Sequence, residues 1–254
     1  MRRILSSTGL ILCWIMLFQG SLAALEPLLI VTDPWPPYSL VENNRITGID
    51  TEIIQAVFQK MKTPITIESH PWNRCLSLLE NRKADAILDA SITPERKKFL
   101  LFPEEPVSEG ITVFFIKKGR VIPYTRLEDM NKFKAGAQLG YSYCDEIDKT
   151  PFALKAERVQ SLEQNFKKLI LGRIDFVIES DVVGYYEAKR LGLSDKIDII
   201  PNAQFCHSGN YLAFAKKSGH EQLATRFSKE LKAFKKTKEY RIILEKYKGK
   251  TGLK

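Results

Sequence analysis

The sequence KADAILDASITPER, from Lys83 to Arg96, is the stretch from which the fold can be worked out. Its apolar segment, residues 85–88, follows a helical pattern and predicts a short buried strand. Asp89 and Ser91 come directly after that segment and carry side chains suited to holding a ligand. The stretch therefore predicts a strand that ends in polar groups.

The second half of the same stretch has the chemistry of a helix start. Thr93 can cap a helix, Pro94 suits its first position, and Glu95 favours the positive end of its dipole. A helix N-terminus beside hydroxyl groups favours anions, and the guanidinium of Arg96 can pair two-pronged with a carboxylate. The alternative is a capped surface helix whose arginine is solvated.

The first 23 residues have the pattern of a secretory signal peptide. A basic start at Arg2 and Arg3 precedes an apolar run from residue 9 to 18, and Ser21-Leu22-Ala23 offers a cleavage site. The run is too short to span a membrane as a helix. We expect cleavage after Ala23 and a soluble, exported mature protein.

Composition and charge exclude several function classes. The chain has 254 residues, 44% of them hydrophobic, which is enough for one large domain or two lobes. Removing Arg2 and Arg3 lowers the basic count from 39 to 37 against 30 acidic residues, so the mature chain carries about +7. These basic residues are scattered, and nucleic-acid binding is not expected. His70, His207 and His220 lie far apart, so no metal site and no cofactor are expected.

Strand patterns alternate with helix patterns along the mature chain and predict an α/β fold with a largely parallel sheet. Residues 28–32 predict a first buried strand, and residues 72–80 predict a helix. Prolines in the loop after the first strand fix it in an extended form, so it presents Trp35 and Tyr38 in set positions.

One weak internal repeat predicts two similar lobes. Residues 77–88 end a helix and enter a strand, and residues 168–178 repeat that pattern. Polar clusters follow both strands, with Asp89 and Ser91 after the first and residues 179–181 after the second. Ligands in open α/β sheets bind beyond the carboxyl ends of strands, so the two ends are expected to face one cleft.

From residue 27 to about residue 249 the chain resembles the family 3 extracellular solute-binding proteins. The matching segments are Trp35-Pro36-Pro37-Tyr38, Gly48-Ile49-Asp50, Ala84-Asp85-Ala86, Ser91-Ile92-Thr93-Pro94-Glu95-Arg96, Leu139-Gly140-Tyr141-Ser142, Gly172-Arg173-Ile174-Asp175 and the helix from Tyr240 to Tyr247. The resemblance implies a type II periplasmic binding fold, in which two lobes joined by two crossover strands close on a ligand. Lobe one would comprise residues 24–109 plus 211–254, and lobe two residues 110–210.

The resemblance also implies roles for individual residues. Arg96 would take a ligand carboxylate, helped by Ser91. The loop containing Tyr141 and Ser142 would add donors from the other lobe. The aromatic side chains that would pack against the ligand are Trp72, Trp35 and Tyr38.

The chain departs from the family at the lobe-two position where members that bind amino acids usually have an Asp for the ligand's ammonium. That position is Ser180, flanked by Glu179 and Asp181. Strand alternation predicts that Glu179 and Ser180 do not both point into the cleft. Asp89 is the other candidate to compensate, and its alternative role is that of a turn former.

These features predict a monomeric periplasmic protein that captures a small polar solute, an amino acid or related carboxylate, for an inner-membrane ABC permease. Two alternatives remain. One is an enzyme of the same fold, a dehydratase with Glu179 or Asp181 as general acid, and the other is a sensor that presents its ligand to a membrane receptor. Three Cys remain after cleavage, and the shared lobe favours a Cys144–Cys206 disulfide with Cys75 free.

Overall fold

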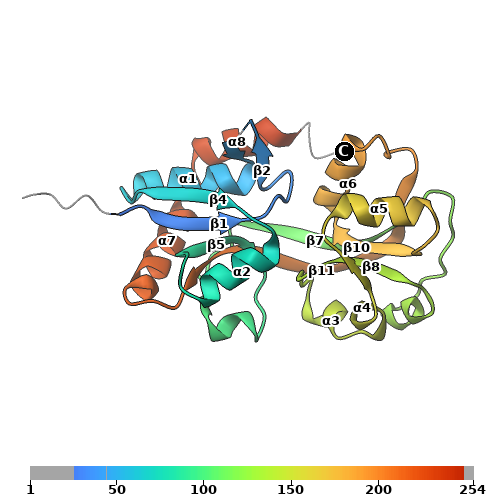
Figure 1. Cartoon of the computed structure of the whole chain (residues 1–254). Coiled ribbons are helices and arrows are strands. Elements are labelled where there is room, and N and C mark those ends of the chain that lie inside the picture. The colour runs from blue at the N-terminus through green and yellow to red at the C-terminus, as the bar shows by residue number, and fades with distance from the viewer. Residues whose placement is uncertain (1–25, 44, 249–254) are drawn as a thin grey trace, which may run out of the picture.

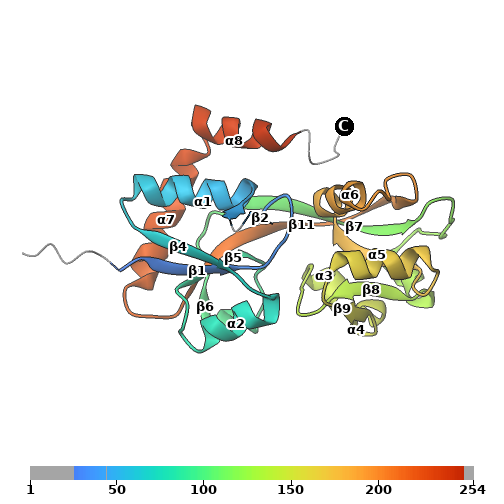
Figure 2. The same cartoon turned by 45° about the horizontal axis from the view of Figure 1, so that its top comes forward.

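The computed structural model describes residues 26–43 and 45–248, so the predicted signal peptide lies outside the described residues. The described chain forms two α/β lobes joined by two long strands (Figures 1 and 2). This confirms the predicted two-lobed architecture. Along the main sheet the strands follow the order β4-β1-β5-β11-β7-β10-β8-β9, with β6 paired to β11.

Lobe one contains both ends of the described chain, and its helices lie on the two sides of its part of the sheet (Figure 1). Its strands are β1 (Leu28–Thr32), β2 (Leu40–Glu42), β3 (Arg45–Thr47), β4 (Ile65–Ser69), β5 (Ala86–Ala90) and β6 (Leu100–Leu101). Its helices are α1 (Ile49–Lys60), α2 (Trp72–Glu80), the 3-10 turn η1 (Arg96–Lys98), α7 (His220–Phe234) and α8 (Lys238–Lys248).

Lobe two repeats this layered arrangement within the middle of the chain. Its strands are β8 (Ala135–Gln138), β9 (Glu157–Val159) and β10 (Phe176–Ser180). Its helices are η2 (Leu127–Lys132), α3 (Asp145–Asp148), α4 (Pro151–Leu154), α5 (Leu162–Ile170) and α6 (Asp181–Arg190). Within residues 26–43 and 45–248, no helix is long and apolar enough to cross a bilayer.

The two strands that pass between the lobes are β7 (Ser108–Lys117) and β11 (Ile197–Ala215). They pair antiparallel with each other, and the ladder has two irregularities along β11. The lobe boundaries expected from the sequence, 109/110 and 210/211, fall inside these strands. The sequence pattern of this region predicts a strand only over residues 211–216, so most of β11 is not apparent from the sequence.

The sheet is parallel within each lobe and antiparallel where the lobes meet. β1 pairs parallel with β4 and β5, and β10 pairs parallel with β8. Side chains in the middle of the inner strands are fully buried, including Ile30, Val31 and Leu88 in lobe one and Val177 in lobe two. Helices on both faces require this, which explains why β1, β5 and β10 are largely apolar runs, whereas the edge strand β4 alternates.

From the sequence, Asp50 could cap the helix that begins at residue 51, but the structure starts α1 two residues earlier. Gly48 is the N-cap, with φ 117°. A Cβ atom there would collide with the backbone of Tyr38, so only glycine fits. Asp50 lies inside the helix, fully buried, and accepts a 2.5 Å hydrogen bond from Ser108 Oγ.

The internal repeat has a physical cause in two aspartates with the same bonding pattern. Asp85 N–H donates to Leu29 O (2.8 Å), and Leu29 N–H donates back to Asp85 Oδ2 (2.8 Å). In lobe two, Asp175 N–H donates to Lys134 O (2.8 Å), and Lys134 N–H donates back to Asp175 Oδ2 (2.7 Å). Each aspartate thus ties the entrance of its strand to the neighbouring strand.

A basic side chain completes each of these two aspartate sites. Lys217 Nζ lies 2.8 Å from Asp85 Oδ1, and Arg120 Nη2 lies 2.6 Å from Asp175 Oδ1. The same motif therefore fixes the register of the parallel strands in both lobes.

The structure joins Cys144 to Cys206 by a disulfide, with 6.4 Å between their Cα atoms. The bond links the loop before α3 to the crossover strand β11. Cys75 is free and buried in α2.

We predict that Asp85→Ala and Asp175→Ala each lower the free energy of unfolding by about 1–3 kcal/mol, because each leaves a strand-entrance N–H and a basic side chain without a charged acceptor. Urea denaturation measures the change. Asp195→Ala, which alters an exposed acid, is the matched control and should leave the midpoint unchanged. Wild-type midpoints in both test variants would contradict this role.

Candidate functional site

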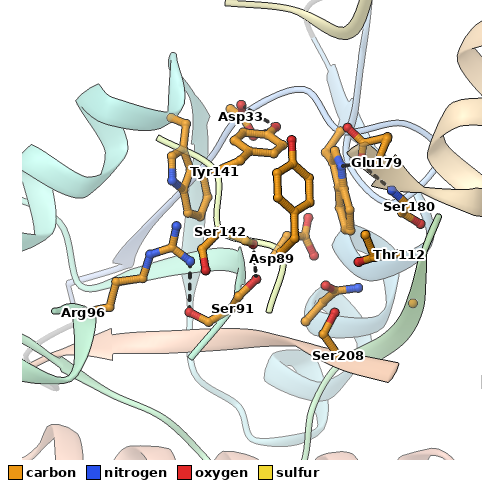
Figure 3. Close-up of a pocket in the computed structure, with 15 residues that line it drawn as sticks. Asp33, Asp89, Ser91, Arg96, Thr112, Tyr141, Ser142, Glu179, Ser180 and Ser208 are labelled. Carbon is orange, nitrogen blue, oxygen red and sulfur yellow. Dashed lines mark hydrogen bonds between the residues drawn. The ribbon is translucent and has the colours of Figure 1, made fainter. Parts of the chain in front are cut away.

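A small cavity lies between the two lobes, where the crossover strands pass (Figure 3). Its volume is about 50 Å³, which gives room for roughly three to five water molecules. The lining residues are Asp33, Trp35, Trp72, Asp89, Ser91, Arg96, Gly110, Thr112, Tyr141, Ser142, Tyr143, Glu179, Ser180, Ser208 and Asn210.

The topology of the sheet explains why these residues meet. Asp33 follows β1, Asp89 and Ser91 stand at the end of β5, Tyr141 follows β8, and Glu179 is near the end of β10. All four are parallel strands whose carboxyl ends point towards the gap between the lobes. The crossover strands add Thr112 from β7 and Ser208 and Asn210 from β11.

Arg96 supplies the positive charge of the cavity, and its side chain is 5% exposed. Nη1 donates to Ser91 O (2.9 Å), and Nη2 donates across the gap to Gly140 O (3.1 Å). The guanidinium stands 5.0 Å from the ring centre of Trp72. Burial lowers the pKa of Arg96 to about 10, so it stays charged at neutral pH. Two of its five N–H groups have carbonyl partners here, which leaves three for a ligand.

The helix expected after Thr93 is only a three-residue 3-10 turn, η1. Thr93 Oγ1 does accept a hydrogen bond from Arg96 N–H (3.1 Å), as a capping residue would. The chain then turns directly into β6, which pairs with β11. An α-helix dipole therefore does not contribute to anion binding here, and the guanidinium carries that role alone.

Three carboxyl groups line the same cavity, and burial raises the pKa of each. The pKa of Asp33 rises to about 7, although hydrogen bonds from Tyr141 OH (3.2 and 2.9 Å) lower it in part. The pKa of Glu179 rises to about 8. The pKa of Asp89 rises well above its ordinary value, because burial is reinforced by the neighbouring Asp50.

Glu179 folds back onto its own backbone. Its Oε1 accepts from Ser180 N–H (2.8 Å) and from Trp35 Nε1 (3.4 Å) across the gap. Its Oε2 is buried and has no hydrogen-bond partner among the described residues. An unpartnered buried carboxylate oxygen is costly, so this atom is available for a ligand donor.

Asp89 and Asp50 form a buried acid pair below the cavity. Burial raises the pKa of both, to about 6 for Asp50, and the charge of Asp50 raises the pKa of Asp89 further, so Asp89 holds its proton the more strongly of the two. Ser39 Oγ donates to Asp89 Oδ2 (3.1 Å), and Ser108 Oγ donates to Asp50. Asp89 has φ 63°, so the strand alternation that relates it to Ser91 breaks at this residue.

Hydrogen bonds across the gap hold the lobes together. Ser91 Oγ donates to Ser142 O (3.2 Å), and Tyr141 OH donates to Asp33. The chain passes close to α2 at Gly140, where φ is 78° and a Cβ atom would collide with Asn73 Oδ1. Glycine is therefore required for this closed arrangement.

Nine of the eleven residues predicted as ligand-binding line the cavity, namely Arg96, Ser91, Asp89, Trp72, Trp35, Tyr141, Ser142, Glu179 and Ser180. Tyr38 does not line it, because its ring stacks beneath Trp35 and is buried in the core of lobe one. Asp181 does not either, because it opens α6, where its Oδ1 accepts from Val182 N–H (2.7 Å).

Two details correct the sequence-based picture of the donors. Glu179 and Ser180 both line the cavity, against the alternation rule, because the strand ends at Ser180, which becomes the N-cap of α6. The hydroxyl of Ser142 donates to Asp148 Oδ2 (2.6 Å), so its proton is already engaged.

Six lining residues were not predicted: Asp33, Gly110, Thr112, Tyr143, Ser208 and Asn210. Asp33 follows β1 just as Asp89 ends β5, so the rule that identified Asp89 also applies to Asp33. The residues of β7 and β11 give no such signal, because the irregular strand β11 has no continuous alternation.

Comparison with known proteins places the chain in one family. The model of the bacterial extracellular solute-binding proteins, family 3, matches residues 28–250. An arginine-binding periplasmic protein of Mannheimia haemolytica is 27% identical over 89% of this chain and 93% of its own length. The arginine-binding extracellular protein ArtP of Bacillus subtilis (strain 168) is 28% identical, over 90% of this chain and 89% of its own.

Solved structures agree on the fold. The arginine-, lysine-, histidine-binding protein ArtJ of Geobacillus stearothermophilus superposes with a TM-score of 0.74 at 20% identity, over 88% of this chain and 96% of that one. A histidine kinase sensor domain with similarity to periplasmic binding proteins gives a TM-score of 0.77 at 19% identity, over 88% and 96% of the two chains. The chain belongs to the bacterial extracellular solute-binding proteins, family 3.

Proposed function

We propose that this monomeric periplasmic protein captures an amino acid or related carboxylate that also carries a positive charge, and delivers it to an inner-membrane ABC permease. The names of the curated relatives, which are arginine-binding proteins, support this solute class. L-Arginine is therefore the first probe.

One observation carries the proposal: a single buried guanidinium and three carboxyl groups line one small cavity. Arg96 lies on one side of the cavity and Glu179 on the other (Figure 3). A solute with a carboxylate at one end and positive charge beyond it matches that separation.

In the bound state Arg96 holds the ligand carboxylate through the three N–H groups that lack a protein partner, with Ser91 beside it. Glu179 accepts the ammonium at its unpartnered Oε2, and Asp33 or Asp89 takes a second cationic group. Trp35 and Trp72 supply the apolar walls.

Closure would bring the parts of the site together. Lobe one (residues 24–109 plus 211–254) and lobe two (110–210) would open by bending at β7 and β11. Opening breaks the Arg96–Gly140 and Tyr141–Asp33 contacts, which admits the ligand. No catalytic step is assigned, because the curated relatives are binding proteins, and bound ligand is expected to be recovered unchanged.

We predict that Arg96→Ala weakens binding of L-arginine at least 100-fold, because losing one partner of a buried charge pair costs on the order of 3–5 kcal/mol. Isothermal titration calorimetry measures the affinity. Arg74→Ala changes an exposed arginine of α2 and serves as the matched control. Wild-type affinity in the folded Arg96→Ala variant would exclude Arg96 as the anchor.

We predict that the affinity for L-arginine rises between about pH 6 and pH 8.5. A cation binds the ionised carboxylate, whereas burial keeps Asp33 (pKa about 7) and Glu179 (pKa about 8) partly protonated in the free protein. Each carboxyl therefore contributes up to about tenfold in affinity per pH unit below its own pKa. Calorimetry across this range gives the slope.

Glu179→Gln should bind L-arginine more weakly and show a shallower pH dependence, because it removes the carboxyl that titrates at the higher pH. Glu80→Gln, at an exposed position of α2, should keep the wild-type slope. A flat profile in the wild type would show that no buried carboxylate receives the cation.

A further inference from the structure

A second, larger space adjoins the small cavity between the lobes. This outer groove has a volume of about 670 Å³, far more than the 50 Å³ of the inner cavity. It is lined by residues of both lobes. A groove of this size matches a small-molecule subsite.

Four residues line both spaces and form the boundary between them: Asp33, Trp35, Trp72 and Tyr141. The hydrogen bond from Tyr141 OH to Asp33 (2.9 Å) lies at this boundary. Arg96 lines only the inner cavity. A ligand can therefore place its carboxylate on Arg96 in the inner cavity and extend past Tyr141, so that its other end lies in the groove.

Two buried polar atoms of groove-lining residues lack hydrogen-bond partners among the described residues. They are Trp72 Nε1, a donor in lobe one, and Gln138 Oε1, an acceptor in lobe two. Trp72 is 7% exposed and Gln138 is 6% exposed. Both residues contact Tyr141, through a ring contact at 5.9 Å and a backbone hydrogen bond at 3.3 Å. These two atoms belong to residues that line the groove, and once their side chains turn towards it they match the C=O and N–H of an amide.

The charge of the groove is negative. Its acidic lining residues are Asp33, Glu42, Glu163 and Glu187, against the single guanidinium of Arg190. Arg190 lies 2.6 Å from Glu187 and 3.0 Å from Glu163, so these three side chains together carry about one negative charge, and Glu42 adds another. The groove therefore favours a positively charged occupant.

We propose that the outer groove is a second subsite, which takes an amide-linked basic residue, so that the protein binds dipeptide-sized basic ligands. The C-terminal residue occupies the inner cavity with its carboxylate on Arg96. The amide passes Trp72 and Gln138, and the N-terminal residue lies in the groove near Glu42. This inference rests on the proposed function for the orientation of the ligand.

The test compares four probes by calorimetry on the full mature chain: L-arginine, Ala-Arg, Arg-Arg and Glu-Arg. In Ala-Arg the α-nitrogen of the C-terminal residue is an amide, so the ion pair with Glu179 is lost. We therefore expect Ala-Arg to bind, but more weakly than L-arginine, with its amide at the two unpartnered atoms. Arg-Arg is expected to bind about tenfold more tightly than Ala-Arg, and Glu-Arg more weakly than Ala-Arg, because of the groove's charge.

Two variants separate the groove from the inner cavity. Glu42→Gln should lower the preference for Arg-Arg over Ala-Arg and leave L-arginine binding unchanged, because Glu42 lines only the groove. Gln138→Leu should weaken both dipeptides and spare L-arginine. Glu80→Gln, outside both spaces, is the control.

The outcomes are distinguishable. Binding of L-arginine without binding of any dipeptide would overturn the second subsite and leave the proposed function standing. Equal binding of Arg-Arg, Ala-Arg and Glu-Arg would also overturn it. If no probe binds, both the proposed function and this inference fail. A preference for Arg-Arg that Glu42→Gln removes would establish the subsite.

Discussion

Burial of the Arg96 guanidinium between the lobes is the constraint on which the cleft depends. A buried charge costs several kcal/mol unless hydrogen bonds replace its water. Arg96 meets this requirement with Ser91 O in lobe one and Gly140 O in lobe two. Because one acceptor belongs to each lobe, the charge is satisfied when the lobes are together, and under the proposed function its three remaining N–H groups hold the ligand carboxylate. In that proposal, closure and ligand recognition depend on one side chain.

The carboxyl groups of the cavity respond to burial differently from Arg96. Burial raises their pKa values, so they keep their protons to higher pH. The neighbouring charge of Asp50 adds to burial in raising the pKa of Asp89, so Asp89 keeps its proton. Asp50 in turn accepts from Ser108 of β7, and Ser108 accepts from Asn210 of β11. The electrostatic interaction of Asp89 with Asp50 and these two hydrogen bonds therefore connect the cavity to both crossover strands.

The sequence predicted those parts of the fold and of the site whose patterns involve only neighbouring residues. The helix Trp72–Glu80 and the polar end of β5 were predicted because periodicity and strand-end chemistry lie within a few residues. β11 was mostly missed, because Pro201 and two register irregularities break its alternation and only pairing with β7 makes it one strand. Asp33 was missed because its loop was interpreted through its aromatics. Glu179 and Ser180 were not expected to face the cavity together, and that expectation was wrong because alternation fails where a strand passes into a helix.

The Cys144–Cys206 disulfide makes the two lobes unequal. Its two cysteines are 62 residues apart in the sequence. In the chain-entropy account, closing a loop of that size raises the free energy of the unfolded state by roughly 4 kcal/mol. The described part of lobe one has a single thiol, Cys75, and gains no stabilisation from a disulfide. The loop carrying Tyr141 is thereby fastened covalently to its own half of the cleft. It must travel with lobe two as a rigid body, so ligand exchange occurs by movement between the halves rather than by loosening of the loop itself.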